Sequence, residues 1–119
     1  MGLIIHELVN DLDDTLAALA DPTRRRVVYL LSKGPRRAGE LAAATGMSPP
    51  ALSRHLRVLR LNGLVESEGR DEDARVRVYR LRPQPFAALQ AWLDQVDAFW
   101  RDQLSAFKTH AERTAKRRT

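Results

Sequence analysis

The stretch SPPALSRHLRVLRLNG, residues 48–63, constrains the fold more than any other part of this 119-residue chain. Ser48 followed by Pro49 is typical of a helix start, because serine caps a free amide and proline is tolerated at the first helical position. Asn62 and Gly63 are typical of a helix end. Between them, apolar residues at steps of four and three form one seam, which we expect to be buried: Leu52, Leu56 and Leu59.

The opposite face of this predicted helix is polar and basic, with Ser53, Arg54 and Arg57 pointing away from the leucines. An α-helix fits the major groove of B-DNA, where an arginine can donate two hydrogen bonds to guanine and a short serine permits close approach. For any single arginine, a solvated position or an ion pair with Glu40 or Glu66 explains the residue about as well. The pattern as a whole favours contact with a polyanion.

Three further helices are expected before residue 48. Apolar residues at helical spacing predict one within residues 1–21. Asp21-Pro22 begins a second over about 22–33, which Gly34-Pro35 ends, and a third covers about 38–45 before Gly46. The turn between the third helix and the helix of residues 48–63 gives a helix-turn-helix arrangement.

From Leu64 the apolar period changes to two, which predicts a β-hairpin with strands over about 64–70 and 74–81. Val76, Val78 and Leu81 are its expected apolar positions. The alternation places Arg75 and Arg77 on one face, so the ribbon is basic on one side. With Arg70 at its tip, this ribbon is a candidate wing that contacts the DNA backbone or minor groove.

The last predicted helix covers about residues 86–107 and is followed by a polar, frayed tail from Lys108. Its aromatic residues at helical spacing allow two interpretations, a ligand pocket or a dimer contact, and we favour the dimer contact. Together with the apolar stripe of the first helix, the candidate interface comprises Leu8, Leu12, Leu16, Leu89, Trp92, Leu93, Val96, Phe99 and Trp100.

Composition excludes several classes of function. The chain has no cysteine, so disulfides and thiolate metal sites are excluded. Residues 34–39, GPRRAG, have the glycine spacing of a phosphate loop but lack the lysine and the hydroxyl residue that follow it, and no other catalytic motif is present, so no enzyme is expected. No apolar run is long enough to span a membrane and no signal peptide is evident, which predicts a cytoplasmic protein.

Positive charge is concentrated in the middle of the chain. Residues 22–82 carry fourteen Lys and Arg against six acidic residues, while the formal net charge of the whole chain is +5. A basic middle between acidic flanks indicates a module that faces a polyanion, although a solubilising surface is an equally good interpretation of charge alone.

The chain resembles the winged helix-turn-helix repressors of the ArsR/SmtB family, over roughly residues 10–107. The resemblance is carried by LADPTRRRVV, then SPPALSRHLRVL, NGLV and VYRL, in that order and spacing. It implies a mainly α fold with a β-hairpin wing, in the order four helices, two strands and one helix, that dimerises through its first and last helices. It also implies a homodimeric repressor of an inverted-repeat operator, with Ser53 and Arg54 facing the groove.

The chain divides accordingly into an N-terminal dimerisation helix (1–21), a winged helix-turn-helix core (22–82), a C-terminal dimerisation helix (83–107) and a flexible basic tail (108–119). Contact with double-stranded DNA is assigned to Ser48, Pro50, Ser53, Arg54, His55, Arg57, Arg70, Arg75 and Arg77. His55 lies toward the edge of the leucine seam, so a structural hydrogen bond and a phosphate contact are both open.

The chain differs from the metal-sensing members of this family. Their third helix carries a cysteine pair where this chain has GELAAATG, and their last helix carries histidines that are absent here before His110. We therefore expect no metal and no cofactor, and an inducer, if one exists, is unknown. The alternative function is a winged-helix module that binds an acidic protein, which the absence of exposed aromatic anchors on residues 50–57 disfavours.

Overall fold

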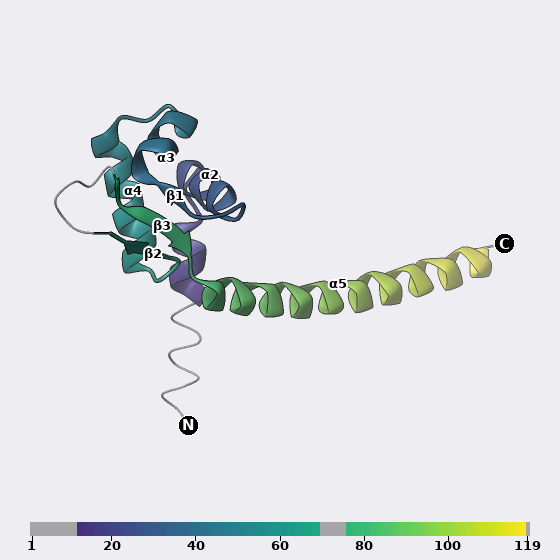
Figure 1. Ribbon diagram of the computed structural model, residues 1–119. Coiled ribbons are helices and arrows are strands. Elements are labelled where there is room, and N and C mark those ends of the chain that lie inside the picture. Colours follow the sequence, from purple (N-terminus) through teal and green to yellow (C-terminus); the bar gives the residue numbers. More distant parts are fainter. Residues whose placement is uncertain (1–11, 70–75, 119) are drawn as a thin grey trace, which may run out of the picture. The chain divides into compact units, whose positions relative to one another are not determined.

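The computed structural model describes residues 12–69 and 76–118, and it is mainly helical with a small antiparallel sheet, as the sequence predicted (Figure 1). Residues 12–18 are helical. The elements that follow are α2 (Pro22–Leu31), β1 (Arg36–Arg37), α3 (Ala38–Thr45), α4 (Pro49–Leu61), β2 (Val65–Glu68), β3 (Val78–Leu81) and α5 (Pro83–Arg118). The chain divides into two compact units, with the boundary between Ala88 and Leu89.

Capping residues set the ends of the three short helices. Asp21 accepts hydrogen bonds from the amides of Thr23 at 2.8 Å and Arg24 at 3.1 Å, which fixes the start of α2. Ser48 accepts a longer bond of 3.4 Å from the amide of Ala51 at the start of α4. Gly46 follows α3 with a φ of 70°, a left-handed conformation that favours glycine.

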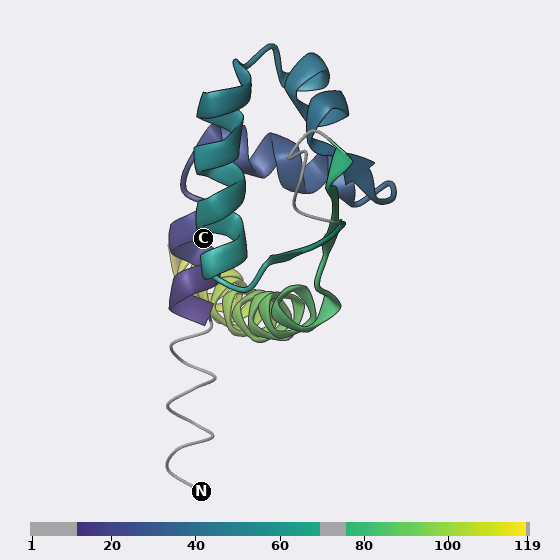
Figure 2. The ribbon, with the colours of Figure 1, turned by 60° about the vertical axis from the view of Figure 1, so that its left-hand side comes forward.

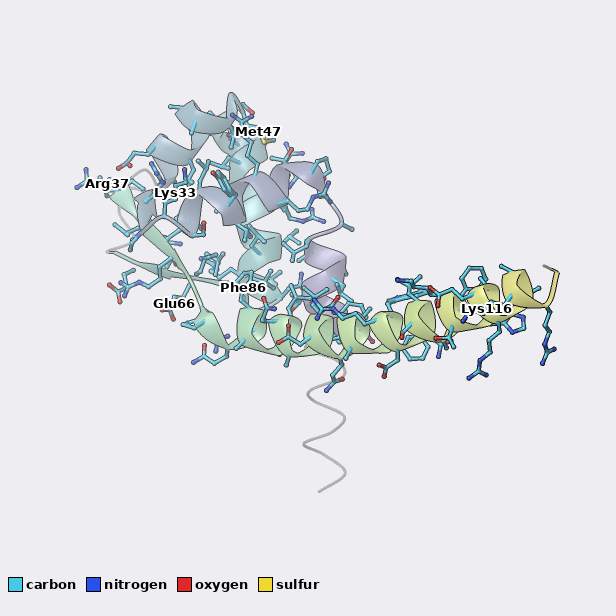
Figure 3. The ribbon with its side chains drawn as sticks, turned by 90° about the vertical axis from the view of Figure 1, so that its right-hand side faces the viewer. Lys33, Arg37, Met47, Glu66, Phe86 and Lys116 are labelled. Atoms are coloured by element: carbon cyan, nitrogen blue, oxygen red, sulfur yellow. The ribbon has the colours of Figure 1, made fainter. Side chains whose placement is uncertain are left out.

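The first unit is built around one hydrophobic core where α2, α3 and α4 pack on one another, as Figure 2 shows. The predicted leucine seam of α4 is buried, with exposed fractions of 1%, 2% and 0% for Leu52, Leu56 and Leu59. The other buried apolar residues come from the remaining elements of the unit: Ala18, Val27, Leu31, Leu41, Leu64, Val65 and Tyr79. Phe86, at the start of α5, packs against this core (Figure 3).

The helix of residues 12–18 faces the core through small side chains. Thr15 and Ala18 are each 1% exposed, whereas Leu16 is 40% exposed and Leu12 is half-buried. The leucine stripe noted in the sequence is therefore not the face that fills the core. It leaves apolar surface on the outside of the first unit.

The sheet contains one strand that the sequence did not predict. The strand order is β1-β3-β2, with β3 pairing antiparallel to both neighbours. Arg36 pairs with Tyr79 in one ladder, and Ser67 pairs with Tyr79 in the other. Because β1 is only two residues long, its pattern has no period to detect, and it exists only through its pairing with β3.

Two details of the hairpin prediction were wrong. The strands are shorter than the predicted 64–70 and 74–81. Val76 is 50% exposed and Val78 only half-buried, whereas Tyr79 is 7% exposed and belongs to the core. Tyr79 lies on the central strand, between β1 and β2, where its large ring covers more of the core than a valine would.

Helix α5 is longer than predicted at both ends, covering 36 residues rather than 86–107. The tail from Lys108 was expected to be frayed, but residues 108–118 continue the helix. This segment contains neither glycine nor proline, and seven of its eleven residues are alanine, lysine or arginine, which favour helix. Among the residues that the structure describes, no helix is both long and apolar enough to cross a membrane.

Candidate nucleic-acid interface

The outward face of α4 is an exposed polar surface of the three-helix core. Leu52 and Leu56 hold one side of the helix in the core, so Ser53, Arg54 and Arg57 are exposed on the other side, as the sequence predicted. Pro50 is also exposed, in the first turn of the helix. The backbone of α4 thus holds two guanidinium groups beside a short hydroxyl side chain.

Much of the positive charge in residues 22–82 has a structural use. The three consecutive arginines of α2 donate hydrogen bonds to backbone carbonyl oxygens of other segments. Arg24 Nε bonds to Ala18 at 2.6 Å, while a terminal nitrogen of Arg25 reaches Leu19 at 2.8 Å. Arg26 bonds to Ala44, at the end of α3, at 2.9 Å. These cations secure the ends of neighbouring helices, which composition alone could not reveal.

The same holds for cations near the sheet. Arg80 forms ion pairs with Glu66, at 3.9 Å, and with Glu68. Arg36 donates to the carbonyl of Leu30 at 3.3 Å. Glu66 was an alternative partner for the arginines of α4, but its ion pair is with Arg80, on the adjacent strand.

Arg54 and Arg57 remain without any hydrogen bond or ion pair to the residues that the structure describes. Glu40, the other alternative partner, forms no ion pair with either of them. An exposed guanidinium with no internal partner loses only water when it meets a phosphate or a base. These two residues are therefore the best-placed cations for an external anion.

Arg37 is a third such cation, and our sequence analysis did not select it. It is exposed, pairs with Val78 through β1, and its side chain points away from the helices (Figure 3). It makes no hydrogen bond or ion pair within residues 12–69 and 76–118. The sequence feature that could have indicated Arg37 is the pair Arg36-Arg37 directly before α3, which lies within GPRRAG.

His55 lies on a different side of α4 from the exposed arginines. Its Nδ1 is 4.0 Å from an Oδ1 oxygen of Asp21, the residue that caps α2. The hydrogen bond from the amide of Arg24 is the largest of the effects on the pKa of Asp21, which lies below its ordinary value. Burial acts in the opposite direction, and the amide of Thr23 and the side chain of His55 make smaller lowering contributions. His55 thus has a structural contact between α4 and α2, and its contact with DNA stays a prediction.

Arg70 and Arg75, two of the predicted DNA contacts, lie outside the described residues. Arg77 is half-buried and already has an interaction within the protein. Its backbone carbonyl accepts a bond of 3.3 Å from the amide of Ala38, which joins the wing to the start of α3.

The second unit, residues 89–118, is a helix that exposes aromatic side chains. The exposed fractions are 38% for Trp92, 45% for Leu93, 58% for Phe99 and 56% for Trp100. The rings of Phe99 and Trp100 meet edge to face, with centroids 5.9 Å apart. Leu89 and Val96 are half-buried, and Leu8, also predicted at the interface, lies outside the described residues. Large exposed apolar surface of this kind is typical of a protein contact.

Charge changes along this helix. Asp94, Asp97 and Asp102 lie in its first half, and Arg101 pairs with Asp97 at 3.1 Å. The second half is basic and includes Lys116, whose side chain points away from the helix (Figure 3). Within the described segments, no three His, Asp or Glu side chains gather closely enough to hold a metal ion.

Comparison with known proteins agrees with this geometry. A family model described as "Bacterial regulatory protein, arsR family" matches residues 21–67, which include α2, α3 and α4. The HTH-type transcriptional regulator Rv2034 of Mycobacterium tuberculosis is 43% identical over 95 residues, which are 80% of this chain and 83% of that protein.

Solved structures extend the likeness to the fold. The crystal structure of the ArsR family transcriptional regulator RHA00566 has a TM-score of 0.67 and 35% identity, covering 76% of this chain and 97% of that one. A solution structure from Mycobacterium bovis, titled as a homodimeric winged helix-turn-helix DNA-binding domain, has a TM-score of 0.60 and 29% identity. It covers 78% of this chain and 83% of that chain.

Proposed function

The chain belongs to the arsR family of bacterial regulatory proteins, and we propose that it is a homodimeric repressor that binds an inverted-repeat operator without sensing a metal. Its membership of the family makes it a DNA-binding transcriptional regulator and not an enzyme. As such it acts where the chromosome is, in the cytoplasm.

One observation carries the assignment of the DNA-reading surface. Six of the eleven arginines that the structure describes in the first unit bond to carbonyls or carboxylates, whereas Arg54 and Arg57 have no partner among the described residues and share the outward face of α4 with Ser53. A helix held in the core by leucines and exposing guanidinium groups suits the major groove, where arginine recognises guanine O6 and N7. We assign reading of bases to these three residues.

We propose that five of the remaining predicted residues contact the phosphate backbone of DNA. Ser48 and Pro50, at the start of α4, and Arg77, at the base of the wing, are proposed to lie along the phosphates, and Arg70 and Arg75 to extend that contact. Arg37 joins this set because it is exposed at the junction of the wing and α3. Contacts of this kind fix the register of the protein on DNA without reading its sequence.

Dimerisation is proposed through the exposed apolar residues of α5, together with Leu12 and Leu16 of the first helix and, beyond the described residues, Leu8. The Mycobacterium bovis domain, which is homodimeric, supports this proposal. A twofold axis relates two recognition helices, so the operator is expected to contain two half-sites about one helical turn, ~34 Å, apart.

Metal independence is proposed from the chemistry of the side chains. The whole chain lacks cysteine, and zinc sites normally use thiolate or imidazole ligands, with carboxylates in support. Mobility of the operator complex should be the same with added zinc and with a chelator. Release of the operator by zinc, at concentrations that leave the protein folded, would contradict this part of the proposal.

The main test is selection of bound duplexes from a random pool by the purified protein, followed by anisotropy titration of the selected site. We expect an inverted repeat and two protein chains for each duplex. Selection of no motif, together with capture of an acidic protein, would favour the protein-interaction alternative.

Dimerisation has a separate test, because it can be measured without DNA. Trp100→Glu places a charge in the proposed interface, whereas Asp97→Glu, a conservative change on the same helix, serves as the control. Sedimentation at micromolar concentration should show a dimer for the wild type and the control, and a monomer for Trp100→Glu. A monomeric wild type would exclude the interface.

A further inference from the structure

The first unit contains a small cavity between the two helices of the helix-turn-helix. Its volume is about 180 Å³, it is partly open to solvent, and side chains from α3, α4 and β3 surround it. The residues that matter here are Gly39, Ala42, Leu52, Ser53, Leu56 and Tyr79. All of them belong to one compact unit, so the cavity does not depend on the placement of α5.

The cavity exists because α3 presents very small side chains where it faces α4. Gly39 and Ala42 provide no more than a methyl group each, and a Cβ built on Gly39 would meet no atom within 4 Å. On the far side, Leu52 and Leu56 are fixed in the core and cannot move into the space without leaving it. The empty volume is therefore a consequence of side-chain size.

The lining defines the chemistry of a ligand. Among the residues that the structure describes, no charged side chain lines the cavity, and only Ser53 and Tyr79 bring polar side-chain groups to it. An ion would lose its hydration shell there without gaining a partner. Apolar cavities of roughly 150 Å³ remain dry and accept benzene, so this volume suits one aromatic ring or a short aliphatic chain.

The position of the cavity connects it to DNA binding. Ser53 lines the cavity and also lies on the outward face of α4, so a molecule in the cavity would touch the side of the helix adjoining the reading surface. It would also contact the leucine seam that holds α4 to the core, because Leu52 and Leu56 line the cavity. A ligand that contacts Ser53 and this seam better when α4 is not on DNA opposes DNA binding.

We propose that this cavity binds a small uncharged molecule, the size of a single aromatic ring, and that its binding weakens the hold of α4 on DNA. The second half of the proposal rests on the proposed function. The site would make the protein a regulator that responds to an apolar compound.

Binding is tested with benzene as the probe and the full chain as the protein. Titration followed by ¹³C NMR should give saturable shifts of the methyl groups of Leu52 and Leu56 and of the Tyr79 ring. Ala42→Leu fills the cavity and should abolish the shifts, whereas Ala43→Leu, at an exposed position of the same helix, should retain them. Should Ala42→Leu fail to fold, Gly39→Leu fills the same space from a position where an added Cβ meets nothing.

The link to DNA is tested by repeating the titration of the selected operator with saturating benzene. We expect benzene to lower the affinity of the wild type for the operator by about fivefold or more, which is the lower end of the usual coupling between two sites. Benzene should not change the operator affinity of Ala42→Leu, whose cavity is filled. No saturable shift in the wild type would exclude the site. Saturable shifts with unchanged operator affinity would exclude the coupling.

Failure of the proposed function gives a different pattern. A protein that binds no DNA but shows the benzene shifts would retain the site and lose the regulatory role. A protein that binds its operator and shows no shifts would retain the function and lose the site.

Discussion

Replacement of Arg54 or Arg57 by alanine tests the reading surface, because the structure separates a binding effect from a folding effect. Neither side chain has a hydrogen bond or ion pair to another described residue, and both are exposed. Their removal should therefore change the free energy of unfolding by less than about 0.5 kcal/mol. Any large loss of operator affinity then reports a lost contact with DNA.

The expected loss of operator affinity follows from the strength of one arginine–guanine contact and from the twofold symmetry of the proposed dimer. A bidentate arginine–guanine pair contributes roughly 1–3 kcal/mol of discrimination, and a twofold dimer loses two pairs for each substitution, or about 2–6 kcal/mol. The lower limit corresponds to about a thirtyfold weaker complex. Affinity for a scrambled duplex should fall much less, since that binding depends on phosphate contacts.

The assay is fluorescence anisotropy with the selected operator and a scrambled duplex, at several salt concentrations, alongside urea unfolding of each variant. Arg101→Ala is the matched control, since it removes the same charge from α5, where an exposed pair with Asp97 contributes only about 0.3–0.5 kcal/mol. If both α4 variants keep the wild-type ratio of operator to scrambled affinity while remaining folded, α4 does not read the DNA and the reasoning fails.

Three further predictions concern stability. Leu59→Ala should lower the free energy of unfolding by about 2–5 kcal/mol in urea titration because Leu59 is 0% exposed, while Leu61→Ala on the same helix, 74% exposed, should change it by less than ~0.5 kcal/mol. Because the folded-state pKa of Asp21 is lowered, its stabilising effect is complete above the unfolded pKa and is lost as pH falls through the lower folded value. The thermal midpoint of Asp21→Asn should therefore approach that of the wild type only in this acidic range, and a constant difference at every pH would contradict the assignment. Gly46→Ala should destabilise by about 1–2 kcal/mol in thermal unfolding because φ is 70°, whereas Gly39→Ala, which is helical and unobstructed, should be neutral or stabilising.

The helices of the first unit were predictable because their signals are local. Asp21-Pro22 and Ser48-Pro49 begin α2 and α4 where the structure has them, and Gly46 follows α3. Among α2, α3 and α4, only the end of α2 differed, at Leu31 instead of about Lys33, where the amide of Lys33 bonds to the carbonyl of Leu30 in a tighter turn. Caps and steric limits act within a few residues, so they can be recognised without knowledge of the fold.

The exposure of the face of α4 that we propose as the reading surface was predictable for the same reason. Burial of one face of α4 by leucines determines that Ser53, Arg54 and Arg57 lie on the other face. The contact of His55 with Asp21 was not predictable, because it depends on how α4 crosses the start of α2. Arg37 was missed because β1 is defined only by pairing with a strand distant in sequence.

What the sequence by itself determined is the set of helices, the buried seam of α4 and the family, since periodicity, caps and motif order are properties of neighbouring residues. Tertiary structure alone decided which of the described arginines bond to other groups of the protein. Arg24, Arg25 and Arg26 carry the same charge as Arg54, yet their guanidinium groups bond to the carbonyls of other segments. The charge of a side chain follows from its residue type, but its partners depend on which backbone groups the folded chain brings within hydrogen-bond distance.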